Sequence, residues 1–350
     1  MKKLSKINTL ILKASVLLYP SLGGIMNRKN KIIIAITSVL LLVIIGGYFI
    51  GDYFVTFALV RPDNGEVGTV NDPNAPKNDQ NFVVDNNKKE LEVLHDNWVK
   101  TIDVSEKEIL SNDGLKLKAI EYMTNENSDK WIIMVHGYTS SNLEMLNRAY
   151  HYGQEGYNIL LPNNRAHGNS EGTYIGMGWL DRLDILLWID EIVKINPDAK
   201  IVLYGISMGA ATVTMTSGEE LPTNVKAVIE DCGYTDVWSM FENQLDYRFG
   251  IPPFPVLNFA HLVGLTKIGY DILDADATSQ LSKSNLPFLF IHGDIDNYVP
   301  VEMAYKLHDA AKNEAKELLI IEGANHAESD YVNPKLYYDT VFKFLDLHVK

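Results

Sequence analysis

A short serine motif constrains the fold of this 350-residue chain more than any other feature of its sequence. Gly205-Ile206-Ser207-Met208-Gly209 follows the apolar run 200–204 and leads into small residues that begin with Ala210. A serine held in a sharp turn between a strand and a helix needs glycine on both sides, because side chains there would collide where strand and helix cross. The motif therefore predicts that Ser207 stands above the end of a buried strand, with its hydroxyl available for nucleophilic attack.

The chain around this motif alternates short apolar runs with helical or loop segments. Ser-Asn-Asp-Gly at 111–114 is a turn sequence, so 101–110 and 115–122 are predicted to form a β-hairpin. Apolar residues at helical spacing predict covering helices at 179–194 and 334–348. The alternation indicates an α/β fold, a mostly parallel sheet covered by helices on both faces. Further strands are expected at 131–135, 158–161, 200–204, 226–230, 287–292 and 317–321.

An interval from Gly233 to Leu281 interrupts the alternation. It contains Phe-Gly-Ile-Pro-Pro-Phe-Pro at 249–255 and separates two strands that would ordinarily be one helix apart. We expect a small cap insertion here, over the carboxyl edge of the sheet. Its apolar residues are expected to contact substrate or, alternatively, to form the cap's own core; they are Ile251, Phe254, Val256, Leu257 and Phe259.

Two further residues complete the chemistry that a nucleophilic serine requires. Serine is a poor nucleophile until a base removes its proton, so a histidine and an orienting carboxylate should follow it in the chain. His326 comes after the predicted strand 317–321, and Asp296 comes after the strand 287–292. The carboxyl ends of parallel strands meet at one edge of a sheet, so these side chains are predicted to lie close to Ser207.

The choice of acid is open to competition from two other carboxylates, Asp294 and Asp231. Asp296 is preferred because it must reach His326 from a turn, and Pro300 near the start of the next helix fixes that turn. Asp294 is expected to brace the same loop through backbone N–H groups. Asp231 follows the strand 226–230, and it remains the alternative acid.

The negative charge of a tetrahedral intermediate needs two backbone N–H donors. One is expected from Met208, directly after the serine. The other is assigned to Tyr138, because Gly137 lets the chain turn back toward Ser207 after the strand 131–135.

An uncharged run near the N-terminus predicts a membrane anchor. Ile32 to Ile50 comprises about 19 residues rich in Ile, Leu and Val, enough to cross about 30 Å of hydrocarbon as a helix. Aromatic residues continue the run, and no small-x-small cleavage site follows it directly, so we expect an uncleaved transmembrane segment over 32–58 rather than a signal peptide.

Charges around the run predict its orientation. Arg28, Lys29 and Lys31 precede it, and the first acidic residue after it is Asp52. The positive-inside rule then places residues 1–31 in the cytoplasm. We therefore expect a single-pass cell-membrane protein with an extracytoplasmic catalytic domain.

The remaining boundaries are inferred from composition. Gly23-Gly24-Ile25-Met26 can be encoded as GGAGGAATTATG, a bacterial ribosome-binding run before a start codon. We hypothesise that translation begins at Met26 and that residues 1–25 are not translated. Residues 61–80 are rich in Pro, Asn, Asp and Gly and are predicted to be a linker, which leaves 81–350 for the α/β domain.

Composition excludes several classes of partner. The net charge of −14 and the pI of about 5.1 argue against nucleic acid, which is bound through clustered Lys and Arg. Cys232 is the only cysteine, so no intramolecular disulfide can form. The histidines lack metal-ligand spacing, and we expect neither a catalytic metal nor a cofactor.

The combined motifs resemble those of the α/β-hydrolase superfamily, from about Thr101 to the C-terminus. In detail the chain looks like the membrane-anchored bacterial branch, whose relatives include Bem46-like proteins and prolyl-oligopeptidase-type serine peptidases. The motifs occur in the family's order: His-Gly at 136–137, Arg-Ala-His-Gly-Asn-Ser-Glu-Gly at 165–172, the serine motif, His-Gly-Asp-Ile-Asp-Asn-Tyr-Val-Pro at 292–300 and a late Gly-Ala-Asn-His at 323–326.

The resemblance implies Ser207 as nucleophile, Asp296 as acid and His326 as base, with Tyr138 and Met208 as oxyanion donors. It implies hydrolysis of a carboxylic ester through an acyl-enzyme. A serine peptidase or amidase on the same triad, with a peptide substrate, is an alternative, as is a non-catalytic membrane-tethered binding protein. One departure is the side chains around the histidine, where relatives usually have glycines.

Overall fold

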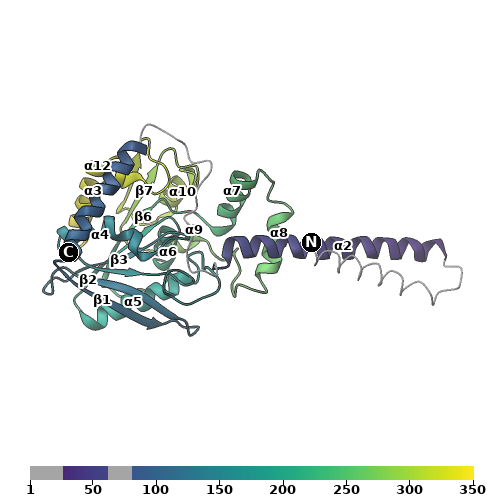
Figure 1. Ribbon diagram of the computed structural model, residues 1–350, viewed down its shortest axis with the longest axis horizontal. Coiled ribbons are helices and arrows are strands. Elements are labelled where there is room, and N and C mark those ends of the chain that lie inside the picture. The colour runs from purple at the N-terminus through teal and green to yellow at the C-terminus, as the bar shows by residue number, and fades with distance from the viewer. Residues whose placement is uncertain (1–26, 62–80) are drawn as a thin grey trace. The chain divides into compact units, whose positions relative to one another are not determined.

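The computed structural model describes residues 27–61 and 81–350. Residues 1–25, which we hypothesise are not translated, lie outside the described residues. Nearly all of the predicted linker also lies outside them. The elements follow in this order (Figure 1): α2 (Arg28–Leu59), α3 (Asn81–Val99), β1 (Asp103–Leu110), β2 (Lys116–Met123), β3 (Lys130–Val135), η1 (Asn142–Met145), α4 (Leu146–Gln154), β4 (Asn158–Pro162), α5 (Asp181–Ile195), β5 (Lys200–Ile206), α6 (Met208–Thr216), β6 (Val225–Asp231), α7 (Val237–Phe249), α8 (Val256–Gly264), α9 (Ala277–Leu281), β7 (Phe288–Gly293), α10 (Glu302–Ala310), β8 (Lys316–Ile321), α11 (Ser329–Val332) and α12 (Pro334–His348).

The strands form one eight-stranded sheet in the order β1-β2-β4-β3-β5-β6-β7-β8. The hairpin β1–β2 and the pair β2–β4 are antiparallel, and every pairing from β4 through β3 to β8 is parallel. The predicted fold class is therefore confirmed, with each predicted strand present. The neighbours β5, β6, β7 and β8 bring their carboxyl ends to one edge, which is where this architecture places its ligands.

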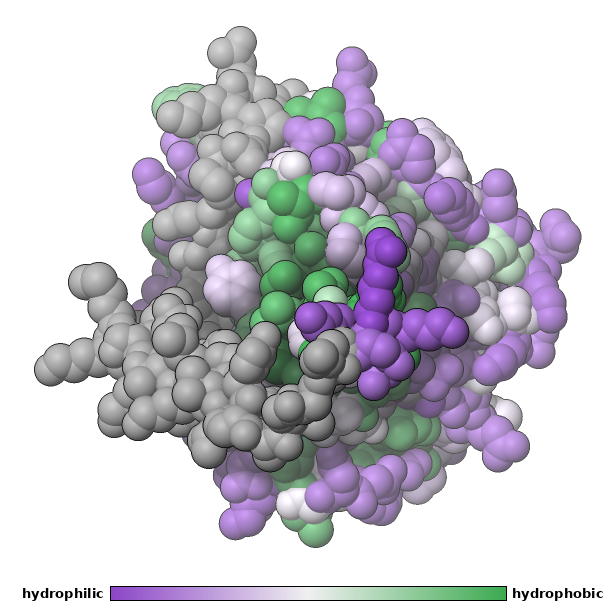
Figure 2. Space-filling model, turned by 90° about the vertical axis from the view of Figure 1, so that its right-hand side faces the viewer, coloured by the Kyte–Doolittle hydropathy of each residue, from purple (hydrophilic) through white to green (hydrophobic). Residues whose placement is uncertain are grey.

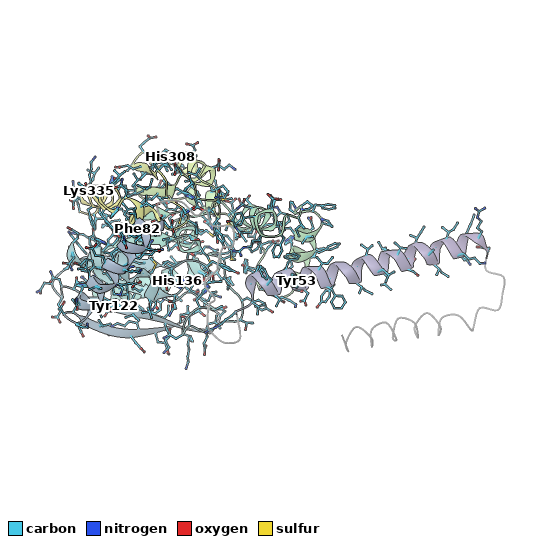
Figure 3. The ribbon with its side chains drawn as sticks, turned by 45° about the horizontal axis from the view of Figure 1, so that its top comes forward. Tyr53, Phe82, Tyr122, His136, His308 and Lys335 are labelled. Carbon is cyan, nitrogen blue, oxygen red and sulfur yellow. The ribbon has the colours of Figure 1, made fainter. Side chains whose placement is uncertain are left out.

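Alternating side chains along each strand supply two cores, one on each face of the sheet. In β3, Trp131 and Ile133 belong to the core that α5 and α6 cover, whereas Ile132 and Met134 belong to the core that α3, α4 and α12 cover. This two-residue period is the geometry of a strand buried on both faces. Figure 3 labels His136, which directly follows β3.

Helix α2 is divided between two compact units, one ending at Ile50 and the other beginning at Gly51. The helix is long and apolar enough to cross a membrane. Most apolar side chains before Gly51 are exposed, among them Ile36, Leu40 and Phe49. Apolar side chains gather in the middle of the face that Figure 2 shows, with polar ones around them.

The last residues of α2 belong to the same unit as the sheet and pack into it. The Leu59 carbonyl accepts a hydrogen bond from the N–H of Ile175 at 2.8 Å, and Val60 forms an isolated bridge with Tyr174. The Arg61 guanidinium donates to the carbonyl oxygens of Ser170 and Gly168 at 2.6 and 2.5 Å. The predicted linker would begin at 61, but the structure ties this residue to the body of the domain.

Helices α7, α8 and α9 lie within the interval predicted to be a cap insertion. Asp236 caps α7 by accepting from the N–H of Ser239, and Asp276 caps α9 in the same way through Ser279. Gly250 ends α7 with a left-handed backbone, a conformation that costs glycine little.

Candidate active site

Ser207 occupies a strained turn between β5 and α6. Its backbone has φ 56° and ψ −118°, outside the ordinary regions for a residue with a side chain. A Cβ at Gly205 would overlap the carbonyl oxygen of Gly209, and a Cβ at Gly209 would overlap that of Val135. Gly205 is therefore required where β5 crosses α6, as the sequence predicts, and Gly209 is required because α6 packs against the end of the adjacent strand β3.

The structure brings Ser207, His326 and Asp296 into one hydrogen-bonded chain. The distance from His326 Nε2 to Ser207 Oγ is 2.8 Å, and that from His326 Nδ1 to Asp296 Oδ2 is 2.7 Å. Each residue lies just beyond the carboxyl end of its strand, β5, β8 or β7. In this arrangement one ring nitrogen can take the serine proton while the carboxylate holds the other.

Asp296 is buried and held in its ionised form. Its Oδ1 accepts hydrogen bonds from the N–H groups of Tyr298 and Val299, both at 2.9 Å. Burial by itself would raise the pKa of Asp296, but the neighbouring rings of His326 and His292 more than offset it and hold the pKa well below its usual range. The carboxylate is thus a fixed hydrogen-bond acceptor for the histidine.

The two competing carboxylates have other partners. Asp294 is expected from the sequence to brace its own loop, but its Oδ1 accepts from the N–H of Gly323 at 2.6 Å, so it bonds instead to the loop that carries His326. Asp231 Oδ2 accepts from the hydroxyls of Tyr337 at 2.6 Å and Tyr204 at 3.2 Å, inside the core. Neither side chain has a hydrogen bond to His326 among the described residues.

The two predicted oxyanion donors lie beside the serine. Met208 is the first residue of α6, and Tyr138 lies on the loop after β3; both line the cavity that contains Ser207. A Cβ at Gly137 would come within 3.3 Å of the Ser207 Cβ, so glycine allows this loop its close approach. Within the described part of the chain, neither backbone N–H has a hydrogen-bond partner.

Two neutral histidines brace that loop. His136 Nε2 accepts from the N–H of Asn164 at 3.1 Å, and His167 Nε2 accepts from the N–H of Thr139 at 3.2 Å. Burial lowers the pKa of His136 to about 3 and that of His167 to about 4, which keeps both rings able to accept. Their role is structural, in keeping with the buried position of His136.

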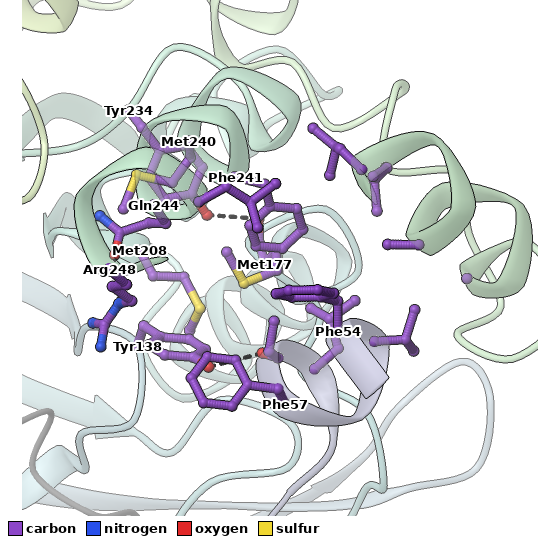
Figure 4. A pocket seen from close by; sticks show the side chains of 18 of the residues that line it. Phe54, Phe57, Tyr138, Met177, Met208, Tyr234, Met240, Phe241, Gln244 and Arg248 are labelled. Atoms are coloured by element: carbon purple, nitrogen blue, oxygen red, sulfur yellow. Dashed lines mark hydrogen bonds between the residues drawn. The ribbon is translucent and has the colours of Figure 1, made fainter. Parts of the chain in front are cut away.

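An apolar cavity of about 310 Å³ opens onto Ser207 (Figure 4). Its walls come from the end of α2, the cap helices α7 and α8, and the loops that carry Tyr138 and Tyr298. Gln244 and Arg248 are polar members, and Gln244 Nε2 donates to the Tyr298 carbonyl at 2.9 Å. The Tyr298 ring in turn lies 4.8 Å from the ring of His326.

Sequence reasoning located only part of this lining. Of the five cap residues expected to contact substrate, Val256 and Leu257 line the cavity, and Ile251, Phe254 and Phe259 are not among its lining residues. Phe254 is 74% exposed, because the segment before α8 turns it outward. Many of the cavity residues that the sequence did not indicate lie on α2, α7 and the Tyr298 loop: Phe54, Val55, Phe57, Ala58, Leu59, Met240, Phe241, Gln244, Leu245, Arg248, Phe249 and Tyr298. The others lie on α8 and on connecting segments: Thr139, Met177, Tyr234, Ala260, Gly264, Ile268 and Ile272.

One group of potential metal ligands overlaps the triad. Single ligand atoms of Cys232, Asp296 and His326 lie within 4.8 Å of one another. Both ring nitrogens of His326 already bond to Ser207 and Asp296, so a metal there would compete with these bonds. The expectation of no catalytic metal stays a prediction.

Comparison with known proteins identifies the superfamily of this chain. The family described as "Serine aminopeptidase, S33" (Hydrolase_4) matches residues 126–244. The uncharacterized protein YqkD of Bacillus subtilis is 30% identical over 220 residues, which is 61% of this chain and 70% of YqkD. The chain belongs to the α/β-hydrolase superfamily.

Two further similarities concern proteins with named activities. The thermostable monoacylglycerol lipase of Bacillus sp. strain H-257 is 24% identical over 247 residues, covering 63% of this chain and 92% of the lipase. The crystal structure of the Pyrococcus furiosus esterase Pf2001 has a TM-score of 0.59 and 24% identity, covering 75% of this chain and 94% of the esterase. The likeness to Pf2001 supports the fold.

Proposed function

We propose that this protein is a serine hydrolase that cleaves a carboxylic ester through an acyl-enzyme. The observation that carries the proposal is the continuous chain of hydrogen bonds from Ser207 through His326 to Asp296. The lipase and the esterase to which the chain is similar are named for action on esters, and this supports the same bond type here.

The proposed reaction has two stages, and the geometry supports a role for each residue in them. His326 Nε2 accepts the proton of the Ser207 hydroxyl as its oxygen attacks the ester carbonyl carbon. The N–H groups of Met208 and Tyr138 stabilise the negative charge on the carbonyl oxygen. His326 then gives its proton to the departing alcohol, which leaves the acyl group on Ser207. Water, deprotonated by the same histidine, releases the acid and restores the serine.

We further propose that the enzyme is held on the cell membrane by one pass of α2, with its catalytic unit outside the cytoplasm. The length and apolar character of the helix support the anchor. The positive charges of Arg28, Lys29 and Lys31 before the apolar run support the orientation. This assignment corresponds to the membrane-anchored bacterial branch of the superfamily.

The test of the ester proposal compares substrates that differ only in the scissile bond. Purified protein is given p-nitrophenyl esters and p-nitroanilides of the same acyl groups, and a fluorophosphonate probe reports whether Ser207 is reactive. We expect labelling of Ser207 and a kcat/KM for the ester at least about 100-fold above that for the anilide. Labelling with faster anilide cleavage would favour the peptidase alternative, to which the name of the matched family points. Absence of both labelling and turnover would favour a non-catalytic protein.

A further inference from the structure

The cavity beside Ser207 has a wall that does not come from the sheet or from the cap. Phe54, Phe57 and Ala58 of α2 line it together with Ser207, and Figure 4 shows the rings of Phe54 and Phe57 at one side, across from Met240 and Gln244. These α2 residues belong to the same compact unit as the sheet, which begins at Gly51. The C-terminal end of the candidate membrane helix is thus a part of the binding site.

Hydrogen bonds attach this helix end to the catalytic machinery. The Tyr138 hydroxyl donates to the carbonyl oxygen of Ala58 at 2.8 Å, and the N–H of the same tyrosine is our proposed oxyanion donor. The Leu59 carbonyl and the Arg61 side chain bond to the loop 168–175. His167, just before that loop, supports Thr139, the residue next to Tyr138. These hydrogen bonds therefore hold the end of α2, which forms the cavity wall, against the domain that contains the sheet.

Close packing attaches the same helix end to the cap. A Cβ at Gly51 would overlap the carbonyl oxygen of Phe259 in α8, so glycine allows the two helices to touch. The Phe249 ring at the end of α7 packs edge-on against Phe54 at 5.4 Å and Phe57 at 5.5 Å. Asp52 forms an ion pair with Lys267. The wall is held from both sides, and its side chains have defined positions.

The lining indicates the ligand. Beyond Ser207, the cavity is enclosed mostly by Phe, Met, Leu, Val, Ile and Ala side chains, which favour an aliphatic chain over a peptide's polar backbone. In the sequence, the wall directly follows the uncharged run 32–50, a segment suited to lipid. A substrate that is itself a membrane lipid would match both features.

We propose that residues 51–59 of α2 form the specificity-determining wall of an acyl pocket, and that the substrate is a lipid ester whose aliphatic acyl chain lies against Phe54 and Ala58. The proposal rests on the ester hydrolysis proposed above. It assigns the membrane helix a second role besides anchoring, because the helix would select the acyl chain.

The experiment measures kcat/KM of the full chain in detergent for p-nitrophenyl acetate and p-nitrophenyl decanoate. Ala58→Leu fills the pocket and is expected to lower the decanoate-to-acetate ratio at least about tenfold, since a single misplaced methylene in a tight site costs that much. Phe54→Ala widens the pocket and is expected to raise the decanoate-to-acetate ratio. Phe49→Ala, the same change at an exposed position on the same helix, is expected to leave the ratio as in the wild type.

A second pair of variants, at two glycines of α2, tests the wall without adding a side chain to the cavity. Gly51→Ala pushes α2 away from α8 and is expected to change the ratio by at least about threefold, whereas Gly46→Ala, which has no atom within 4 Å of the new Cβ, is expected not to change it. Fluorophosphonate labelling of Ser207 shows which variants keep the folded site, and variants that are not labelled are set aside. An unchanged ratio in labelled Ala58→Leu and Phe54→Ala would overturn the wall assignment and leave ester hydrolysis standing. Failure of the wild type to cleave any ester would overturn both.

Discussion

Ser207, Asp296 and His326 lie at the carboxyl ends of the parallel strands β5, β7 and β8, whereas the cavity above them is enclosed by α2 and the cap helices, which are far apart in the sequence. The strand ends are held by the backbone ladder of a doubly covered sheet. The cavity wall is held by side-chain packing between helices. We therefore expect changes at the strand ends to reduce turnover of every substrate and changes in the wall to alter which substrate is preferred.

The largest effect is expected from Ser207→Ala. The change removes the attacking oxygen, so kcat should fall by at least about 10⁴-fold for acetate and decanoate esters alike. Circular dichroism and thermal unfolding check that the fold is kept. Residual activity above a few per cent, or a loss confined to long-chain esters, would contradict the expectation that Ser207 is needed for every substrate.

The second effect concerns the acid. Asp296→Asn should cut kcat by about 10⁴-fold, because the amide favours the wrong histidine tautomer while keeping the side chain's size. Asp294→Asn, on the same loop, and Asp231→Asn, at the end of β6, are matched controls. Each is expected to cost much less turnover because neither side chain bonds to His326. Should Asp231→Asn prove the most damaging of the three, the acid would belong to β6 instead of β7.

The third effect distinguishes cap residues that line the cavity from cap residues that do not. Leu257→Ala, at a buried residue that lines the cavity, should change the decanoate-to-acetate ratio of kcat/KM by about tenfold. Phe254→Ala removes a larger side chain from the same cap but at an exposed position, and the ratio should stay unchanged. Equal effects of the two variants would mean that the cap acts through its own folding rather than through contact with substrate.

The last effect is on the stability of the fold against pH and not on turnover. The pKa of His167 is lowered from 6.5 to about 4 in the folded protein, so the unfolded chain binds this proton first as the pH falls. The neutral ring stabilises the fold fully above about pH 6.5, and this contribution is lost as the pH falls through about 4. Chemical unfolding of wild type and His167→Gln should therefore differ most near pH 7, by up to about 3 kcal/mol, and converge toward pH 4. A difference in unfolding free energy that stays constant between pH 7 and pH 4 would show that the His167 ring does not titrate in this way.

The strands and the residues that follow them could be located from the sequence because their signals are local. Ser207 lies between the two glycines of its motif, and Asp296 and His326 each come after an uninterrupted apolar run. The wall could not be located in this way. Aromatic residues after an apolar run are equally typical of a membrane interface, and no local pattern pairs Phe54 with Phe249 across nearly 200 residues.

The cap illustrates the same limit. The sequence predicts the bounds of the cap because this segment interrupts the alternation of strands and helices. It does not predict the direction in which each cap side chain points. Leu257 is the second residue of α8 and is buried, while Phe254 lies two residues before the helix and is exposed to solvent. Apolar character alone does not separate these two positions, because the separation depends on how α8 packs.

The proposed mechanism requires a covalent acyl group on Ser207 during turnover. Mass spectrometry of the full chain, quenched in acid during turnover of p-nitrophenyl decanoate and then digested, should find the decanoyl group on the peptide that contains Ser207. The group should be absent in Ser207→Ala. Decanoyl attached to another residue, or ester turnover that persists in Ser207→Ala without any adduct, would contradict the proposed mechanism.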